Sequence, residues 1–233
     1  MKILLILFTL FLVFSNPLAA QDPEPVQASE PADAPEPKQS PDAVDATDSA
    51  KTPETVKASN PLTPKDEALI QSVWNEDLAK VELLVKKGAN VNSAEPKKKR
   101  TVLMVAAANG QFDIVEFLYG KGADINARDS DSQTALMYAS RNRFNATPDN
   151  AIAKFLLSNG AEVNVRSKKK GFTALMLAAS AGNVELVQQL LEKGADPAIK
   201  DNFGVSAAAM AKKRGKTAVV SILSDPPKPV VDS

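Results

Sequence analysis

The sequence predicts an all-α protein, a solenoid of about five stacked helix-turn-helix units. Gly-Ala pairs begin at Gly88, Gly122, Gly160 and Gly194, which lie 34, 38 and 34 residues apart. Thr-x-Leu-Met runs recur 33 and 39 residues apart, and between them aliphatic residues lie three and four apart, as on the buried face of a helix. A repeat of this length cannot bury its own apolar face, so we expect neighbouring units to stack around a continuous core.

The N-terminal segment, residues 1–20, predicts a secretory signal peptide. Lys2 precedes an apolar run over residues 3–14, and small residues end the segment at Ala20. The run is shorter than the ~20 residues that span a bilayer. Leu18 is larger than the residue usual at that distance from a cleavage site, so an uncleaved inner-membrane anchor facing the periplasm is the alternative. We therefore expect a bacterial protein that is periplasmic or secreted.

Residues 21–64 predict a disordered, proline-rich linker. They include nine prolines, no aromatic residue, and nine acidic residues against three lysines. Such a segment buries too little apolar surface to offset the entropy lost on ordering. Residues 65–224 form the predicted repeat domain, with 23 basic and 17 acidic residues, and residues 225–233 a disordered tail. The linker is interpreted as a spacer or, as a second hypothesis, as an acidic segment that folds back over the basic repeats.

The composition argues against an enzyme. The chain has no histidine and no cysteine, which excludes imidazole acid–base catalysis, thiol nucleophiles, disulfides and the usual zinc, copper and iron ligand sets. No glycine-rich phosphate loop, catalytic triad or convincing carboxylate pair is visible in the sequence. We therefore expect no enzymatic activity and no cofactor.

Threonine and glycine mark the helix boundaries within a repeat. A threonine precedes each apolar run and can cap the first helix through its side-chain oxygen; these residues are Thr101, Thr134 and Thr173. Each second helix closes on a Gly-Ala pair, whose glycine can adopt the left-handed conformation that ends a helix. In the degenerate first repeat, Thr63 and Pro64 predict the helix start, and Trp74 is expected to shield that end of the core. Repeat three is longer than its neighbours, which predicts a loop insertion around residues 144–148.

Taken together, these motifs resemble ankyrin repeats. The family pattern of a turn followed by Thr-x-Leu-x-x-Ala-Ala is matched by "DSDSQTALMYAS", "KKKGFTALMLAA" and "DNFGVSAAAMAK", and its closing signature by "GANVN", "GADIN" and "GAEVN". The resemblance covers about 160 residues and implies L-shaped units with projecting β-turn or hairpin fingers, the terminal repeats being degenerate. It departs from the family where a histidine often follows the leucine, because this chain has Met104, Met137 and Met176, which we expect to fill the core.

The resemblance also implies where a partner binds, because ankyrin repeats usually use the finger tips and the exposed face of the first helix. At the matching finger positions the chain has Lys97, Lys98, Lys99, Arg100, Ser130, Asp131, Gln133, Lys168, Lys169, Lys170, Phe172, Asn202, Phe203 and Val205. The matching positions of the inner helices are Asn109, Arg141, Asn142 and Ser180.

Two kinds of side chain stand out in this set. Phe172 and Phe203 occupy positions where the repeat requires no aromatic residue, so each is interpreted either as a binding anchor or as a clasp over the neighbouring finger. The lysine-rich tips, residues 97–100 and 168–170, lie two repeats apart and are expected to make separate contacts or simply to keep the loops soluble.

The leading hypothesis is a non-enzymatic, monomeric module of the periplasm that binds an envelope protein through its finger tips and inner helices. The alternative is a binder of an anionic envelope polymer or membrane surface through the lysine-rich tips. We expect no nucleic-acid partner, because the chain carries an export signal and lacks exposed aromatic residues between its basic ones. Membrane association is expected only if the N-terminal segment stays uncleaved.

Overall fold

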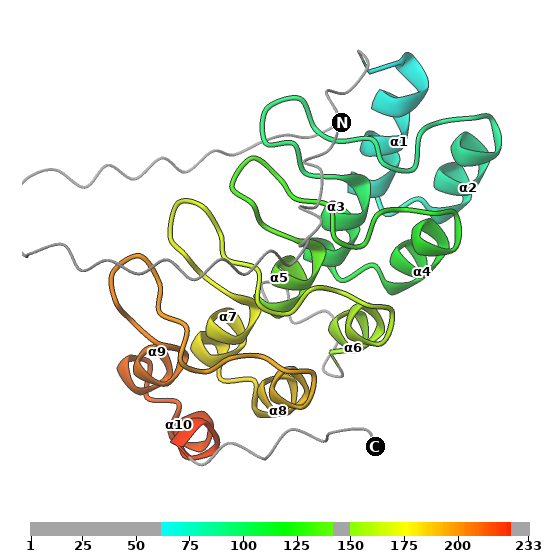
Figure 1. Ribbon diagram of the computed structural model, residues 1–233. Helices are drawn as coiled ribbons and strands as arrows, with labels where there is room; N and C mark the ends of the chain where they lie inside the picture. The colour runs from blue at the N-terminus through cyan, green and yellow to red at the C-terminus, as the bar shows by residue number, and fades with distance from the viewer. Residues whose placement is uncertain (1–61, 142–149, 225–233) are drawn as a thin grey trace, which may run out of the picture. The chain divides into compact units, whose positions relative to one another are not determined.

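The computed structural model describes residues 62–141 and 150–224, and this part of the chain forms ten short helices (Figure 1). They run in pairs along the chain: α1 (Pro64–Trp74), α2 (Leu78–Lys86), α3 (Val102–Asn109), α4 (Phe112–Gly120), α5 (Ala135–Ser140), α6 (Ala151–Ser158), α7 (Ala174–Ala181), α8 (Val184–Glu192), α9 (Ala207–Lys213) and α10 (Thr217–Ser224).

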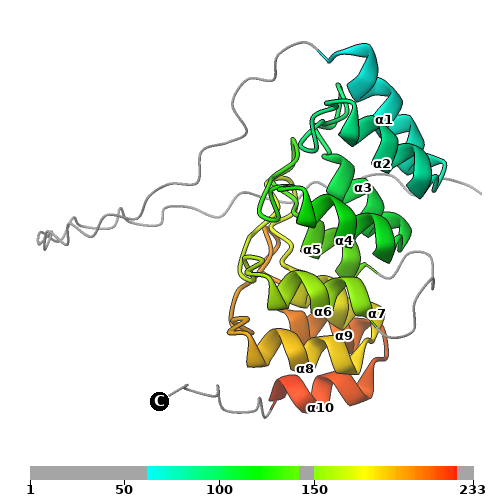
Figure 2. The same ribbon diagram turned by 90° about the vertical axis from the view of Figure 1, so that its right-hand side faces the viewer.

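The helices pack in two layers. The odd-numbered helices contact one another in chain order, from α1 to α9, and so do the even-numbered helices from α2 to α10. The two helices of each pair also pack against each other. Five pairs therefore follow one another as a stack (Figure 2). We call the odd-numbered helices inner and the even-numbered helices outer, because the long loops project beside the odd-numbered layer (Figure 1).

Loops between an outer helix and the next inner helix extend away from the stack. Two of them contain an isolated antiparallel bridge, between Ala94 and Thr101 and between Lys200 and Ser206. Within the described residues, no β-strand extends beyond these isolated bridges. This arrangement confirms the predicted all-α solenoid with hairpin or turn fingers.

The predicted helix caps are present. The side-chain oxygen of each capping threonine accepts a hydrogen bond from the backbone N–H three residues later, as from Met104 to Thr101 at 3.3 Å. At α1, Thr63 and Asp66 form a reciprocal capping box, so Thr63 and Pro64, the last residues assigned to the linker, belong to the cap and first turn of this helix. Burial alone would raise the pKa of Asp66. Hydrogen bonds from the backbone of Asn90 and from Thr63 lower it by more, so the pKa of Asp66 lies below its usual value.

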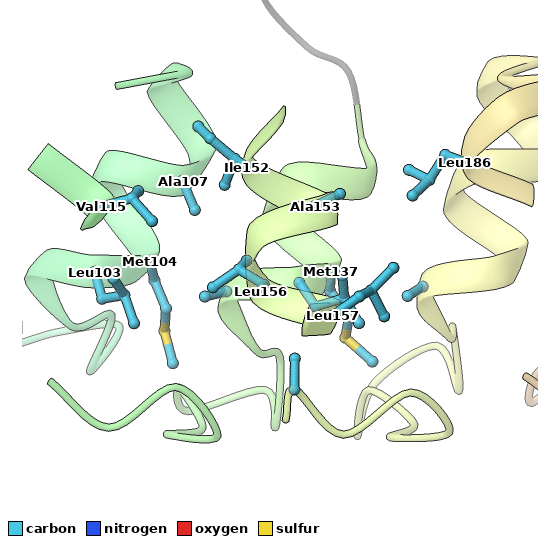
Figure 3. Packing of buried hydrophobic residues seen from close by; sticks show 14 of the residues in the cluster. Leu103, Met104, Ala107, Val115, Met137, Ile152, Ala153, Leu156, Leu157 and Leu186 are labelled. Atoms are coloured by element: carbon cyan, nitrogen blue, oxygen red, sulfur yellow. The ribbon is translucent and has the colours of Figure 1, made fainter. Parts of the chain in front are cut away.

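The core runs without interruption between the two layers. Met104, Met137 and Met176 are almost fully buried, each beside the leucine that precedes it, which confirms that these methionines are packing residues. Figure 3 shows Leu103 and Met104 on one side of Leu156 from the outer layer, with Met137 and Leu157 on the other. Core contacts therefore join each repeat to the next.

The two ends of the stack differ from the prediction in one respect. In the last repeat Val219 and Leu223 are buried, with Val220 and Ile222 partly so, as expected. Trp74 at the other end remains 41% exposed, so it shields the core only in part. Its indole Nε1 instead donates to Glu95 of the first finger at 3.2 Å, because α1 ends beside the base of that loop.

Several sequence predictions concern residues outside the described part of the chain. These are the signal peptide at residues 1–20, the linker as far as residue 61, the loop insertion around residues 144–148 and the tail at residues 225–233. Within residues 62–141 and 150–224, no helix has the length and apolar character needed to cross a membrane.

Candidate partner-binding surface

Four loops form a row beside the inner helices (Figure 1). We call them finger 1 (residues 95–100), finger 2 (residues 129–133), finger 3 (residues 167–172) and finger 4 (residues 201–205). They contain 14 of the 18 residues predicted to bind a partner. The row is therefore the candidate surface.

Neighbouring fingers are joined by hydrogen bonds between their main chains. The Ser130 N–H donates to the Lys98 carbonyl at 2.9 Å, and the Lys168 N–H donates to the Asp131 carbonyl at 2.7 Å. The Asn202 N–H donates to the Lys170 carbonyl at 2.9 Å. These bonds hold the four tips in a fixed order, with finger 2 between the two lysine-rich tips.

Finger 1 is braced at its base by an ion pair. Arg100 donates to Glu95 through Nε at 2.6 Å and Nη2 at 2.8 Å, and its guanidinium lies 5.3 Å from the centre of the Trp74 ring. Arg100 is thus largely buried in a structural cluster, whereas Lys97, Lys98 and Lys99 of the same tip are exposed. Of the four residues predicted to form the basic tip, Lys97, Lys98 and Lys99 are therefore exposed to solvent, whereas Arg100 stabilises the base of the finger.

Finger 2 directs its polar side chains inward. The Tyr138 hydroxyl donates to Asp129 Oδ2 at 2.8 Å, and burial together with this carboxylate raises the pKa of Tyr138 well above its usual value. Gln133 is buried and accepts a hydrogen bond from Arg141, whose guanidinium also lies 5.4 Å from the centre of the Tyr138 ring. Gln133 and Arg141 are therefore drawn together by the fold, while Ser130 remains exposed.

Finger 3 divides into an exposed tip and a half-buried base. Lys168, Lys169 and Lys170 are exposed, whereas Phe172 packs against the core and accepts a cation–π contact from Lys170 at 5.5 Å. Gly171 has φ of +71°, and a Cβ placed there would lie 2.5 Å from Asn202 Oδ1. Glycine suits this junction best, because the positive φ disfavours a side chain and the close approach of Asn202 leaves no room for a Cβ.

Finger 4 presents the most exposed large apolar side chain among the described residues. Phe203 is 76% exposed at a tip held by Asp201, whose Oδ1 accepts the backbone N–H of Phe203 at 2.9 Å and of Val205 at 2.8 Å. Val205 is half-buried. The amide of Asn202 donates to the carbonyls of Lys168 and Lys169, so this exposed residue also joins two fingers.

The predicted inner-helix residues are less exposed than the finger tips. Asn109 and Ser180 are half-buried at the C-terminal ends of α3 and α7, the ends farthest along the helix from the capping threonine. Asn142 lies outside the described residues. The finger row thus provides most of the accessible candidate positions.

Sequence reasoning missed a second row of polar contacts between repeats. Asn126 donates through Nδ2 to the Gly160 carbonyl at 3.1 Å and accepts the Glu162 N–H through Oδ1 at 2.8 Å. Asn92 and Asn164 accept the backbone N–H of Asp124 and Asp196 in the same way. The signal was the final asparagine of the "GANVN", "GADIN" and "GAEVN" motifs, which recurs with the repeat.

Other candidate sites are few in the described part of the chain. A hollow of about 410 Å³ between α2 and α4 is lined by Glu82, Val85, Lys86, Phe117 and Lys121, on the outer layer. No group of three or more acidic side chains within residues 62–141 and 150–224 is arranged to hold a metal ion.

Comparison with known proteins agrees with this geometry. The family model for ankyrin repeats, in three copies, matches residues 69–167, 129–201 and 145–231. The chain is 31% identical over 176 residues to the ankyrin repeat and KH domain-containing protein mask-1 of Caenorhabditis elegans, covering 70% of this chain and 6% of that protein. It is 30% identical over 148 residues to a putative ankyrin repeat-containing protein of Treponema pallidum, covering 63% and 47%. The human ankyrin repeat and SOCS box protein 6 is 36% identical over 121 residues, covering 49% and 28%.

The fold is a repeat scaffold with a row of projecting loops, and the chain belongs to the ankyrin-repeat family. Members of this family are generally non-enzymatic protein–protein interaction modules, which agrees with the function class expected from the sequence. The chain spans less than half the length of each of these three relatives.

Proposed function

We propose that this chain is an exported interaction module of the bacterial periplasm that binds an envelope protein through fingers 1 to 4. The export part of the proposal is supported by the sequence of residues 1–20, which has the charged start, apolar run and small-residue end of a signal peptide. The binding part is supported by the repeat architecture, in which the core and the helix caps do not use the exposed side chains of the lysine-rich tips and of Phe203.

One observation carries the proposed binding site. Phe203 is 76% exposed, whereas the other exposed large apolar side chains of the described residues, Leu83 and Trp74, are 48% and 41% exposed. An aromatic side chain gains about 2 kcal/mol when it is buried at an interface, and such residues are enriched among binding hot spots. The fold itself obtains little burial from Phe203, so its burial by a partner accounts best for its position.

The test is in vivo photocrosslinking of the full-length chain in a bacterial host related to its source, with the photoreactive residue at Phe203 or, as a control, at Leu83 on outer helix α2. We expect position 203 to crosslink to one defined envelope protein and position 83 not to do so. A probe at Val205 should crosslink to the same protein when Phe203 is intact. This crosslink should be lost in a chain that also carries Phe203→Ala. Equal products at positions 203 and 83 would contradict the proposed site.

A second candidate function is binding of an anionic envelope polymer or membrane surface. The observation that favours it is the exposure of Lys97–Lys99 and Lys168–Lys170 at two tips of the same row. Such binding would weaken strongly with added salt and would not respond to Phe203→Ala. Cosedimentation with anionic vesicles and with purified envelope polymer at 50 and 300 mM salt, comparing wild type with Phe203→Ala, distinguishes the two functions.

A further inference from the structure

The fingers carry four acidic side chains, and each one is used inside the fold. Glu95 accepts two hydrogen bonds from Arg100 and one from Trp74. Asp129 accepts the backbone N–H of Asp131 and of Gln133, each at 2.8 Å, and the Tyr138 hydroxyl. None of these bonds comes from a lysine ammonium.

The remaining two acids also serve the backbone. Asp131 accepts the Lys169 N–H at 2.7 Å and the Gln133 side-chain amide at 3.1 Å. Asp201 accepts the backbone N–H groups of its own finger. The carboxylates of fingers 2 and 4 therefore accept hydrogen bonds from main-chain N–H groups and, in finger 2, also from the side chains of Tyr138 and Gln133. None of them forms an ion pair with a tip lysine.

The six tip lysines form no ion pair with another described residue. The ion pairs within residues 62–141 and 150–224 join Arg100 to Glu95, Arg128 to Glu162 and Lys154 to Glu185, and none includes a tip lysine. All six side chains are exposed, and among them Lys170 contacts the Phe172 ring. Their ammonium groups are available to an anionic partner.

The separation of the two lysine tips is set by the fold. Finger 2 is bonded to finger 1 through Ser130 and to finger 3 through Lys168, so one repeat always lies between the tips. At ~8–10 Å per packed helix, two repeats place the tips ~16–20 Å apart. An extended polypeptide advances ~3.3 Å per residue, so about six residues reach from one tip to the other.

We infer that fingers 1 and 3 together bind an extended acidic segment of a polypeptide, at least about six residues long. This inference rests on the proposed function and names the chemistry of the protein partner. A polypeptide fits better than a lipid or polymer surface because Phe203, on the finger next to the second lysine tip, offers an apolar contact in the same row. The bonded fingers keep both tips in place before binding, which lowers the entropy lost when the partner binds.

The test measures binding of fluorescein-labelled tetraglutamate and dodecaglutamate to the purified full-length chain by fluorescence anisotropy. Tetraglutamate reaches one tip, whereas dodecaglutamate reaches both, so we expect the longer peptide to bind at least tenfold more tightly at 50 mM salt. The variant K97Q/K98Q/K99Q should reduce dodecaglutamate binding to the level of tetraglutamate, and so should K168Q/K169Q/K170Q.

A matched control removes the same charge elsewhere. The triple variant K86Q/K193Q/K212Q changes three exposed lysines on α2, after α8 and on α9, and we expect its affinity to stay within twofold of wild type. Circular dichroism and thermal melts check that all variants fold. An equal loss in the control variant, or no gain with peptide length, would overturn the inference, since net charge alone would then explain binding.

Two further measurements separate the possible failures. Tighter binding to phosphatidylglycerol vesicles or to polyphosphate than to dodecaglutamate would overturn the inference in favour of an anionic surface or polymer. Loss of dodecaglutamate binding in the lysine variants, combined with no crosslinked envelope protein at position 203, would retain the acidic-segment site and reject the proposed envelope partner. Crosslinking at position 203 without any peptide binding would retain the proposed envelope partner and reject the acidic-segment site.

Discussion

At the scale of single residues, many side chains of this protein serve the backbone of a neighbouring repeat. Asp131 accepts a hydrogen bond from the Lys169 N–H, and Asn202 donates to two carbonyls of finger 3. Asn126 hydrogen-bonds to the Gly160 carbonyl and to the Glu162 N–H in the loop that follows α6. A polar side chain that satisfies a main-chain group contributes a modest net free energy, but removing it leaves that group unpaired. Variants at these positions should therefore act between repeats.

Tyr138 gives a prediction about pH. Its folded-state pKa is raised by burial and by Asp129, so the folded state favours the neutral phenol. The resulting stability is constant below the unfolded pKa of about 10 and is lost as pH rises above that value toward the folded pKa. Urea unfolding between pH 9 and pH 11 should show a steeper loss of stability in wild type than in Tyr138→Phe.

Tyr119→Phe is the matched control, because the chain has two tyrosines and the Tyr119 ring packs edge-on against Phe155. The control variant should keep the steep alkaline loss of wild type. At pH 7 Tyr138→Phe should cost about 1.5–3 kcal/mol, the net contribution of one hydrogen bond to a charged acceptor. Parallel pH profiles for wild type and Tyr138→Phe would contradict the assignment.

Gly171 and Gly204 give a paired prediction about the joint between fingers 3 and 4. Both have positive φ, +71° and +77°, but only at Gly171 would a Cβ meet atoms of another finger, while Gly204 has open space. Gly204→Ala should cost about 1 kcal/mol from the backbone conformation alone. Gly171→Ala should cost at least about 1 kcal/mol more, because Asn202 must move. Chemical denaturation of both variants measures the difference, and equal losses would show that the joint tolerates a side chain.

At the scale of elements, the helices are too short to be stable alone and depend on their caps and on the next pair. The threonine caps fix where the inner helices begin, and the asparagines after the outer helices tie consecutive loops together. The chain thus has two bonded rows, one through the fingers and one through these asparagines.

Asn126→Ala should weaken the boundary between the second and third repeats. It removes one donated and one accepted hydrogen bond, so we expect a loss of about 2 kcal/mol. Asn126→Asp retains the acceptor for Glu162 N–H but not the donor for the Gly160 carbonyl, and should lose an intermediate amount. Asn75→Ala, at an exposed hydrogen bond after α1, is the control and should change stability by less than about 0.5 kcal/mol. Thermal and urea unfolding rank the three variants.

The helices and caps could be predicted from the sequence because they depend on local residue type and on the repeat. The period located the helix pairs, Thr101, Thr134 and Thr173 marked their starts, and the glycines that follow the outer helices have the expected positive φ. The finger residues were placed correctly on loops for the same reason. Which of them are accessible could not be predicted.

Accessibility depends on which neighbouring groups each finger side chain contacts, within its own repeat and in the next. Gln133 is buried because Arg141 reaches it from the end of α5, and Phe172 is half-buried because it reaches the core. Trp74 donates a hydrogen bond to Glu95, 21 residues later, and covers the end of the stack only in part. Each outcome depends on side-chain direction, which residue spacing alone does not specify.

At the scale of the whole stack, the main helix contacts of each described repeat are within itself and with its neighbours, so stability is approximately a sum of repeat and interface contributions. The finger row and the core extend along the same direction. A weakened repeat in the middle therefore interrupts two sets of neighbours, whereas a weakened end loses only one.

Leu156 and Leu223 test this difference. Leu156 of α6 is fully buried in the middle of the stack, and Leu223 of α10 is 7% exposed in the last repeat. Leu156→Ala should cost about 2–5 kcal/mol and lower hydrogen-exchange protection throughout the described repeats. Leu223→Ala should raise exchange mainly in α9 and α10. Uniform loss of protection in both variants would indicate that the stack unfolds as one cooperative unit.

The bonds between fingers bear on how such a surface diversifies. Fingers 1 and 3 are tied to their neighbours through carbonyl and N–H groups of Lys98, Lys168 and Lys170, which every residue except proline supplies in full. The ammonium-bearing side chains have no part in these bonds, so mutation can replace them one at a time while the loops keep their shape. The same framework is therefore able to present a different tip chemistry, and so to fit a different partner, after substitutions that leave its stability nearly unchanged.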